Sequence, residues 1–323
     1  MLSALPAAKV VAQNFVHFES PHVHPIELTP NGSKLLAVNT AAGRLEVFDM
    51  LGSPAYLQRV GSIAVGMEPV SVRARSNTEA WVVNQISDSV SVVDLSSMSV
   101  TATLLTGDEP ADVVFAGSPQ KAFVSVSKMN RLEVFTPTSL ATAPTLVPIA
   151  GEDPRALATD GTRVYAAIFE CGNDSTILSA TKVSSTANPY TGDPNPPPNA
   201  GTGFSPPLTA GLPTAPRAGL IVRRDSAGIW RDVNNANWNA AVSWNLQSND
   251  VAVINANSLA TTYAKGFMTT PMALGMMPDG RVLAVGTEAK NEVRFEPNLR
   301  GVFVRSEAAL LPVGGATTTS RGD

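Results

Sequence analysis

The sequence predicts an all-β protein, a β-propeller of four-stranded blades, from three observations. Short runs rich in β-branched residues alternate with Ser, Asn, Asp and Gly, which is typical of antiparallel strands joined by tight turns. The stretch from Pro69 to Pro110 holds four such runs in roughly 40 residues, the size of one propeller blade. Similar units recur along the chain, as expected for a repeat architecture in which one isolated unit cannot bury both of its faces.

A proline preceded by a polar residue opens each unit, and by subtraction the five prolines stand 44, 41, 44 and 117 residues apart. These pairs are His24-Pro25, Glu68-Pro69, Glu109-Pro110, Asp153-Pro154 and Thr270-Pro271. Third strands of similar pattern are Arg44–Asp49, Ser89–Asp94, Arg131–Phe135 and Glu292–Phe295. A two-sheet sandwich, the alternative for an all-β chain, does not predict such regular internal similarity.

In chain order, the repeats predict five blades and one spare strand. Blades 1 to 3 are expected at 25–66, 69–107 and 110–151, and the spare strand at Val10–Phe18. Blade 4 begins at Pro154, but its third strand returns only at Asp250–Asn255, which leaves an insertion at 170–247. Blade 5 is expected from Pro271 to about Gly315, with Val302–Leu311 as its last strand. Because propellers close by combining strands from both termini, we expect 1–323 to be a single propeller domain that is incomplete, or a fragment of one.

The insertion is expected to have two unlike halves. Thr186–Pro216 is dominated by Pro, Gly, Asn and Thr, so it should lack regular structure and be the first site of proteolysis. The second half contains Trp230, Trp238 and Trp244, which we expect to hold the insertion against blade 4.

Composition excludes several classes of function. The net charge is −4 with no basic run, which argues against a nucleic-acid partner, and no apolar run approaches the ~20 residues of a membrane span. Cys171 is the only cysteine, so the chain has no internal disulfide and no Cys-x-x-Cys-His for haem attachment; the sequence assigns it no role. No secretory signal is visible in residues 1–20. No nucleophile, zinc-protease or phosphate-binding motif occurs either, so we expect no catalytic residues.

The residues that precede the blade-opening prolines form the candidate site. In a propeller, the loop that enters the innermost strand faces the central channel. We therefore expect His24, Glu68, Glu109 and Asp153 to converge at one channel mouth. Converging carboxylates repel one another and favour a cation such as Ca²⁺. The residues leave open the alternative that these side chains form hydrogen bonds within turns or stay solvated.

Two strands carry a resemblance to a known repeat family. Leu36–Thr40 and Trp81–Gln85 are similar to the Tyr-Val-Thr-Asn strand of YVTN β-propeller repeats, whereas Phe123–Val126 and Val282–Gly286 lack its Asn. The resemblance implies a propeller that is typically seven-bladed.

A narrower resemblance covers the second half of the chain. Ala218–Val222, Trp238–Leu246, Asp250–Ile254 and Gly286–Glu296 resemble the propeller part of large bacterial proteins that also carry a c-type cytochrome, peroxidase-like domain. This implies a periplasmic or extracellular location, with haem only in a domain further along. It also implies a protein partner or a fused cytochrome domain.

These observations favour a non-catalytic binding or scaffold module, the sensing or docking part of an extracytoplasmic, cytochrome-containing protein. The alternative is a metal-dependent propeller lactonase or hydrolase that uses a cation at the channel mouth. A surface-layer or adhesion module is a third possibility. Fold class alone does not select among them.

Overall fold

The computed structural model describes residues 21–52, 56–179, 220–232, 235–289, 304–311 and 320–322. These residues form five four-stranded antiparallel sheets and one three-stranded sheet. We number the four-stranded sheets as blades 1 to 5 in chain order.

Blades 1 to 3 are simple meanders. Blade 1 contains β1 (Ile26–Leu28), β2 (Lys34–Asn39), β3 (Arg44–Leu51) and β4 (Tyr56–Ala64). Blade 2 contains β5 (Pro69–Ala74), β6 (Glu79–Asn84), β7 (Ser89–Asp94) and β8 (Ser99–Leu105). Blade 3 contains β9 (Pro110–Ala116), β10 (Lys121–Val126), β11 (Arg131–Phe135) and β12 (Thr145–Pro148), with the short 3-10 helix η1 (Ser127–Met129) after β10.

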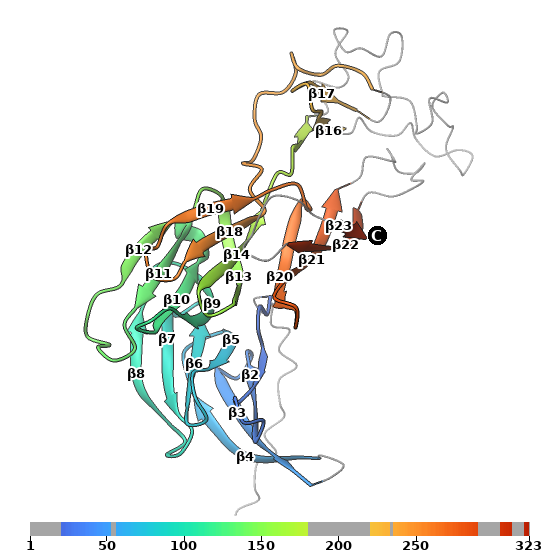
Figure 1. The fold of residues 1–323 in the computed structure, drawn as a ribbon. Coiled ribbons are helices and arrows are strands. Elements are labelled where there is room, and N and C mark those ends of the chain that lie inside the picture. Colours follow the sequence, from blue (N-terminus) through green and yellow to red (C-terminus); the bar gives the residue numbers. More distant parts are fainter. Residues whose placement is uncertain are drawn as a thin grey trace, which may run out of the picture.

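Blade 4 combines two segments that lie far apart in the sequence, whereas blade 5 is made of consecutive strands. Blade 4 contains β13 (Glu152–Thr159), β14 (Arg163–Glu170), β18 (Val251–Asn255) and β19 (Thr261–Ala264). Blade 5 contains β20 (Thr270–Met276), β21 (Val282–Ala289), β22 (Val304–Leu311) and β23 (Ser320–Gly322). Figure 1 shows the blades following one another in an arc from β2–β4 to β20–β23.

The opening proline of blades 2 to 5 lies beside a β-bulge. The ladder register shifts between Pro69 and Ser71, between Pro110 and Val113, between Pro154 and Leu157, and between Pro271 and Ala273. Proline has no N–H to donate to the ladder, so pairing resumes only after extra residues. The sequence signal of each repeat is therefore also the point where the first strand bends.

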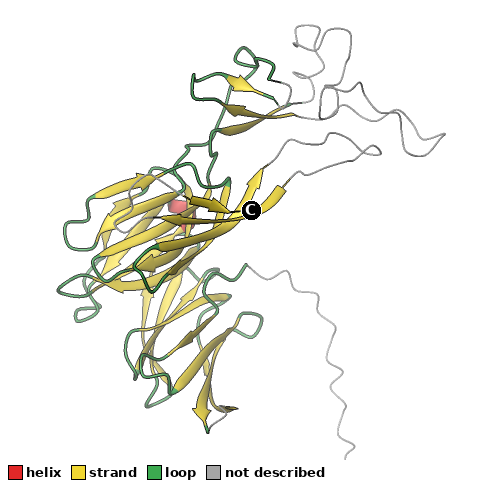
Figure 2. Cartoon of the chain, turned by 45° about the vertical axis from the view of Figure 1, so that its right-hand side comes forward, coloured by secondary structure: helices red, strands yellow, loops and turns green. Residues whose placement is uncertain are grey.

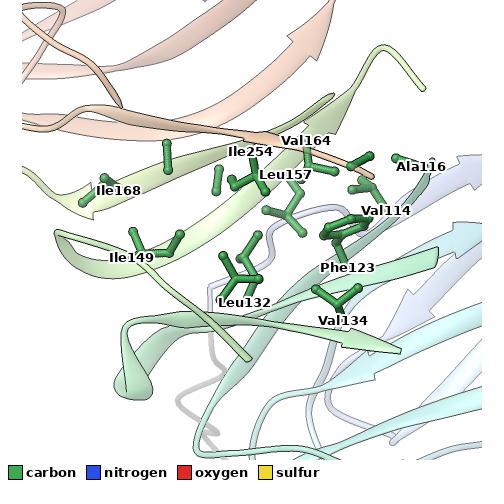
Figure 3. Close-up of a cluster of buried hydrophobic side chains, with 14 residues drawn as sticks. Val114, Ala116, Phe123, Leu132, Val134, Ile149, Leu157, Val164, Ile168 and Ile254 are labelled. Carbon is green, nitrogen blue, oxygen red and sulfur yellow. The ribbon is translucent and has the colours of Figure 1, made fainter. Parts of the chain in front are cut away.

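The hydrophobic core lies between blades rather than within them. One cluster joins blades 1 and 2 around Leu36 and Val72, and a second joins blades 2 and 3 around Trp81 and Val124. Figure 3 shows the third, in which Phe123 and Leu132 of blade 3 pack against Leu157 of blade 4. A fourth joins blades 4 and 5. Blades 2, 3 and 4 each have a neighbouring blade on both sides. Successive side chains of their strands point to opposite faces, so both faces are buried.

Between β14 and β18 the chain forms a separate small sheet, of β15 (Ser175–Leu178), β16 (Leu220–Arg224) and β17 (Trp230–Arg231). Figures 1 and 2 show it standing outside the arc of blades. Its core contains Leu178, Val222, Trp230 and Trp238. The expected role of the tryptophans needs correction, because these two bury against the small sheet itself and Trp244 is 60% exposed.

The expected strands of blade 5 also need correction. β22 pairs with β21 in register over eight residues, from Val282–Leu311 to Ala289–Val304, so Val304–Leu311 is the third strand of the blade and β23 is the fourth. β22 alternates exposed and buried side chains and pairs with all eight residues of β21, which a four-residue strand at 292–295 could not. That segment, the spare strand at 10–18 and the Pro-rich stretch 186–216 lie outside the described residues.

Among the residues that the structure describes, no helix has the length and apolar character of a membrane span.

Candidate functional site at the inner strands

The first strands of the blades lie side by side in chain order. β1 contacts β5, β5 contacts β9, β9 contacts β13, and β13 contacts β20. Each of these strands begins at or near the repeat proline, so the repeat places the same part of every blade at the inner side of the arc. Charged residues on these strands are therefore brought together from distant parts of the sequence.

Arg73 and Asp112 form the centre of this arrangement. The Arg73 guanidinium on β5 donates from Nε and Nη2 to the two carboxylate oxygens of Asp112 on β9, at 3.1 and 2.8 Å. The same pair holds β13, because Arg73 Nη2 donates to the Leu157 carbonyl at 2.9 Å and Asp112 Oδ2 accepts from the Leu157 N–H at 3.0 Å. One ion pair thus joins blades 2, 3 and 4.

The side chain of Asp112 is fully buried, and that of Arg73 is 16% exposed. Burial by itself lowers the pKa of Arg73, but the charge and hydrogen bonds of Asp112 outweigh it, and the pKa is raised. The Arg73 guanidinium therefore stays charged. Asp112 Oδ1 also accepts from the Val113 N–H at 2.8 Å, so its oxygens are surrounded by donors.

Blade 1 extends the network through Glu27 and His24. Glu27 Oε2 lies 3.8 Å from Arg73 Nη1 and 2.5 Å from His24 Nε2. The backbone of His24 forms an isolated parallel bridge with Ser71 of β5, and the Val72 N–H donates to its carbonyl at 2.9 Å. His24 therefore lies against the inner strand of blade 2.

The three expected acidic residues share one backbone geometry. Glu68, Glu109 and Asp153 each have a positive φ, of 52°, 54° and 60°, directly before the repeat proline. The N–H of Glu109 donates to Asp88 Oδ1 at 3.0 Å, and that of Asp153 donates to Asn130 Oδ1 at 2.9 Å. The proline repeat thus identified equivalent positions in blades 2, 3 and 4. His24 differs, because its chain pairs with β5 instead of making this turn.

The side chains at these positions turn to different neighbours. Asp153 makes a paired contact with Arg155, at 3.1 and 2.8 Å, and the Arg155 guanidinium lies 4.3 Å from the ring centre of Phe169. Glu109 accepts a long hydrogen bond of 3.4 Å from Gln85 Nε2, and His24 contacts Glu27. Within the described part of the chain, no three His, Cys, Asp or Glu side chains are grouped as a metal site requires. The calcium hypothesis for His24, Glu68, Glu109 and Asp153 therefore gains no support and stays a prediction.

A second buried polar group lies where the small sheet meets blades 4 and 5. Cys171 donates from Sγ to Asp250 Oδ1 at 2.8 Å, and burial raises the pKa of both groups. The carboxylate of Glu288 on β21 is fully buried and accepts from Arg223 of β16, from Asn173 Nδ2 and from Thr269 Oγ1. These contacts fasten the small sheet to blade 5.

The sequence contained a signal for the central ion pair that pattern analysis missed. Charged residues interrupt otherwise apolar first strands, as in Val-Ser-Val-Arg73 and Pro-Ala-Asp112. A charge that replaces an apolar residue on a buried strand needs a partner. Finding that partner required the arrangement of the blades.

No family model and no curated protein matches this chain. Among solved structures, Kuenenia stuttgartiensis hydrazine synthase is similar with a TM-score of 0.58 and 16% identity, over 96% of this chain and 68% of that chain. A functionally unknown protein from Desulfotomaculum acetoxidans DSM 771 has a TM-score of 0.37 and 17% identity, over 44% and 50% of the two chains. A 6-phosphogluconolactonase candidate from Bacteroides uniformis ATCC 8492 has a TM-score of 0.44 and 13% identity, over 92% and 87%.

At such low identities a structural likeness speaks only for fold, and scores below 0.5 carry no argument. Together with the five four-stranded sheets, the first comparison confirms the predicted class: this is an all-β chain of β-propeller type.

Proposed function

We propose that this chain is a non-catalytic β-propeller that binds or scaffolds a protein partner. The observation that supports this most is the pairing of charged side chains on the inner strands. Arg73 pairs with Asp112 and with the backbone of Leu157, and Asp153 pairs with Arg155 on the same strand. A catalytic centre needs polar groups directed at a substrate, whereas these groups are directed at one another, and the Arg73–Asp112 pair joins three blades into a rigid support.

The docking surface of this proposal is formed by Ile177 of the small sheet and by Trp244 in the segment that leads from it to β18. Their exposed fractions are 63% and 60%, and Thr176 Oγ1 donates to the Trp244 carbonyl at 2.7 Å, which ties the backbone of residue 244 to the strand that carries Ile177. Exposed tryptophan is typical of residues that dominate binding energy at protein interfaces. The Glu288–Arg223 ion pair supports this surface by fastening the sheet to the propeller.

The finer part of the proposal rests on the sequence resemblance. The blades are YVTN-like repeats, the protein works in the periplasm or outside the cell, and the partner is a c-type cytochrome domain, either fused or separate. Haem belongs to that domain, because this chain has no Cys-x-x-Cys-His.

Site-specific photo-crosslinking in the native host tests the proposal. A photoreactive phenylalanine analogue at Trp244 is expected to give one discrete adduct, either to a separate protein or to a fused domain of the same chain, and the attached domain should carry covalently bound haem. The same analogue at Leu105, which is 77% exposed on blade 2, is the matched control and should give none. No adduct at Trp244, or equal adducts at both positions, contradicts the docking surface. An adduct without haem contradicts the cytochrome assignment.

A separate assay addresses the hydrolase alternative. The purified chain is expected to hydrolyse simple lactones no faster with calcium than without it. Calcium-dependent turnover that Glu109→Gln abolishes would contradict the non-catalytic proposal.

A further inference from the structure

Two kinds of segment lie together at one end of the propeller. One is the turn between the second and third strands of a blade, and the other is the connection from one blade to the first strand of the next. They share an end because blades 1 to 3 are antiparallel meanders and the chain at His24 runs parallel to Ser71 on the first strand of blade 2. Around blades 2 and 3 we call these segments the end surface; they are 65–68, 85–88, 106–109, 127–130 and 149–152.

Hydrogen bonds hold neighbouring segments of the end surface against one another. The Met67 N–H donates to Ser87 Oγ at 3.0 Å, and the Glu109 N–H donates to Asp88 Oδ1 at 3.0 Å. The turn of blade 2 is therefore joined to the connections on both of its sides. The end surface is continuous from the entry into blade 2 to the entry into blade 3.

Three exposed apolar side chains stand on the end surface. Met67, Ile86 and Met129 are 60%, 50% and 45% exposed. Met67 is hydrogen-bonded to the residue that follows Ile86, and a methyl group added at Gly107 would lie 3.0 Å from Met129 Cγ. Methionine is flexible and polarisable, and it is enriched where proteins meet. These side chains therefore offer an adaptable apolar contact.

Carboxylates surround this apolar contact. The five segments contain one basic residue, Lys128, and five acidic residues, which are Glu68, Asp88, Asp108, Glu109 and Glu152. Among the residues that the structure describes, no lysine or arginine forms an ion pair with the last four. The opposite end of the blades differs, since acidic residues there have basic partners, in the pairs Asp49–Lys34, Asp160–Arg163 and Asp279–Arg281.

A buried amide adds to the negative potential at Glu109. Gln85 is 5% exposed, and its Nε2 donates to Glu109 Oε2 at 3.4 Å, so the amide points toward that carboxylate. Its Oε1 has no hydrogen-bond partner in the described part of the chain. At the same position of blades 1 and 3, Thr40 and Ser127 donate to carbonyl groups of the next blade, at 2.7 and 3.1 Å. Blade 2 thus departs from the repeat and leaves a buried acceptor unsatisfied, a cost that a positive charge beside Glu109 offsets.

We propose that the end surface around Glu109 binds a basic segment of a protein partner. Lysine or arginine side chains of the partner lie beside the carboxylates, and its apolar side chains lie on Met67, Ile86 and Met129. Interfaces of this kind have an apolar centre and a polar rim, and complementary charge speeds their formation and selects the partner.

The class of partner rests on the proposed function, and the positive charge of the partner is what this inference adds. The end surface shares no residue with the surface formed by Ile177 and Trp244. A test at either surface can therefore fail without the other.

Fluorescence anisotropy with two short labelled peptides tests the charge of the partner. One peptide alternates lysine and leucine, and the other alternates glutamate and leucine. The native chain is expected to bind the lysine peptide and not the glutamate peptide, with an affinity that falls as the salt concentration rises. Equal binding of both peptides, or binding of neither, overturns the proposal.

Charge-matched variants locate the binding site of the lysine peptide. Asp108→Asn combined with Glu109→Gln should weaken binding about fivefold. Asp94→Asn combined with Asp279→Asn removes the same charge at the opposite end of the blades and should weaken binding by less than about twofold. Similar weakening in the two double variants would show attraction to the net charge alone and overturn the proposal.

The apolar contact has its own pair of variants. Met67→Gln keeps the charge of the end surface and should weaken binding of the lysine peptide about threefold, because it removes apolar area from the contact. Leu105→Gln, at a side chain that is exposed on the outer strand of blade 2, should leave binding unchanged. Both variants should keep the native melting temperature. A Met67→Gln variant that binds like the native chain contradicts the apolar contact.

Discussion

Arg73 illustrates how a single side chain can join three blades. It contacts Asp112 and the Leu157 carbonyl. Because the Asp112 carboxylate is fully buried, removal of the guanidinium would leave that carboxylate without contact with water. Removing one partner of such a buried ion pair therefore destabilises the protein more than replacing both partners with apolar residues would.

We expect Arg73→Leu to lower the free energy of unfolding by about 3–5 kcal/mol, because it leaves the Asp112 charge buried without a cation. Chemical denaturation measures this change. Arg75→Leu is the control: Arg75 pairs with Glu79 near the surface, and its loss should cost no more than about 1 kcal/mol. Similar losses in the two variants would show that the central ion pair has no special structural role.

Asp160 shows the same logic in a turn. It precedes Gly161, whose φ is +85°, and accepts from the Thr162 and Arg163 N–H groups and the Tyr165 hydroxyl. Burial raises the pKa of Asp160, but the hydrogen bonds from these residues outweigh it and lower the pKa to about 2.

A folded pKa below the unfolded value means that the ionised turn contributes stability above about pH 4, and that this contribution is lost as the pH falls toward 2. Asp160→Asn should therefore cost about 1 kcal/mol at neutral pH, a modest amount because water partly screens the turn. The difference from the native chain should shrink between pH 4 and pH 2. Unfolding curves at several pH values check this, and a constant difference would contradict the assigned pKa.

At the scale of elements, the small sheet depends on two adjacent arginines in unequal surroundings. Arg223 pairs with the fully buried Glu288 of blade 5, whereas Arg224 pairs with Asp174, and both members of that second pair are about 40% exposed. Only the first pair joins the small sheet to a blade.

Arg223→Ala is expected to loosen the attachment of the small sheet, because it leaves the buried Glu288 without a cation. Hydrogen exchange at β15 and β16 should then rise at least tenfold, while the inner strands of blades 2 and 3 stay protected. Arg224→Ala, the matched control, should change exchange little, since exposed ion pairs contribute at most about 1 kcal/mol. If both variants exchange alike, Glu288 does not hold the sheet.

At the scale of the molecule, stability comes from the seams between blades. Blades 2, 3 and 4 each take part in two of the interblade clusters, whereas blades 1 and 5 each take part in one. A repeat protein of this kind has a stability set by interfaces between neighbours.

Native-state hydrogen exchange is therefore expected to be slowest in β6, β10 and β14 and faster in β2 and β21. The burial patterns agree with this order, since the side chains of β6 and β10 are buried on both faces and those of β21 alternate. Uniform protection across all five blades would indicate one cooperative unit and contradict the seam model.

Much of this architecture was readable in the sequence. The proline repeat located the first strands and the equivalent turns at Glu68, Glu109 and Asp153, because an acidic residue followed by proline adopts the same backbone turn in each of these repeats. The third strand of blade 5 was misplaced, since the repeat spacing alone does not show which of two successive apolar runs pairs with β21.

What the sequence by itself determined was the fold class and the strands of the repeat, because alternation and turn chemistry are local. Only the tertiary structure decided which charges meet. Arg73 and Asp112 lie 39 residues apart, and Asp112 and Leu157 lie 45 apart. Their contact depends on the rotation from one blade to the next, which no local pattern encodes. For the same physical reason Trp230 and Trp238 of the insertion pack in their own small sheet, since burial follows the nearest apolar surface in space.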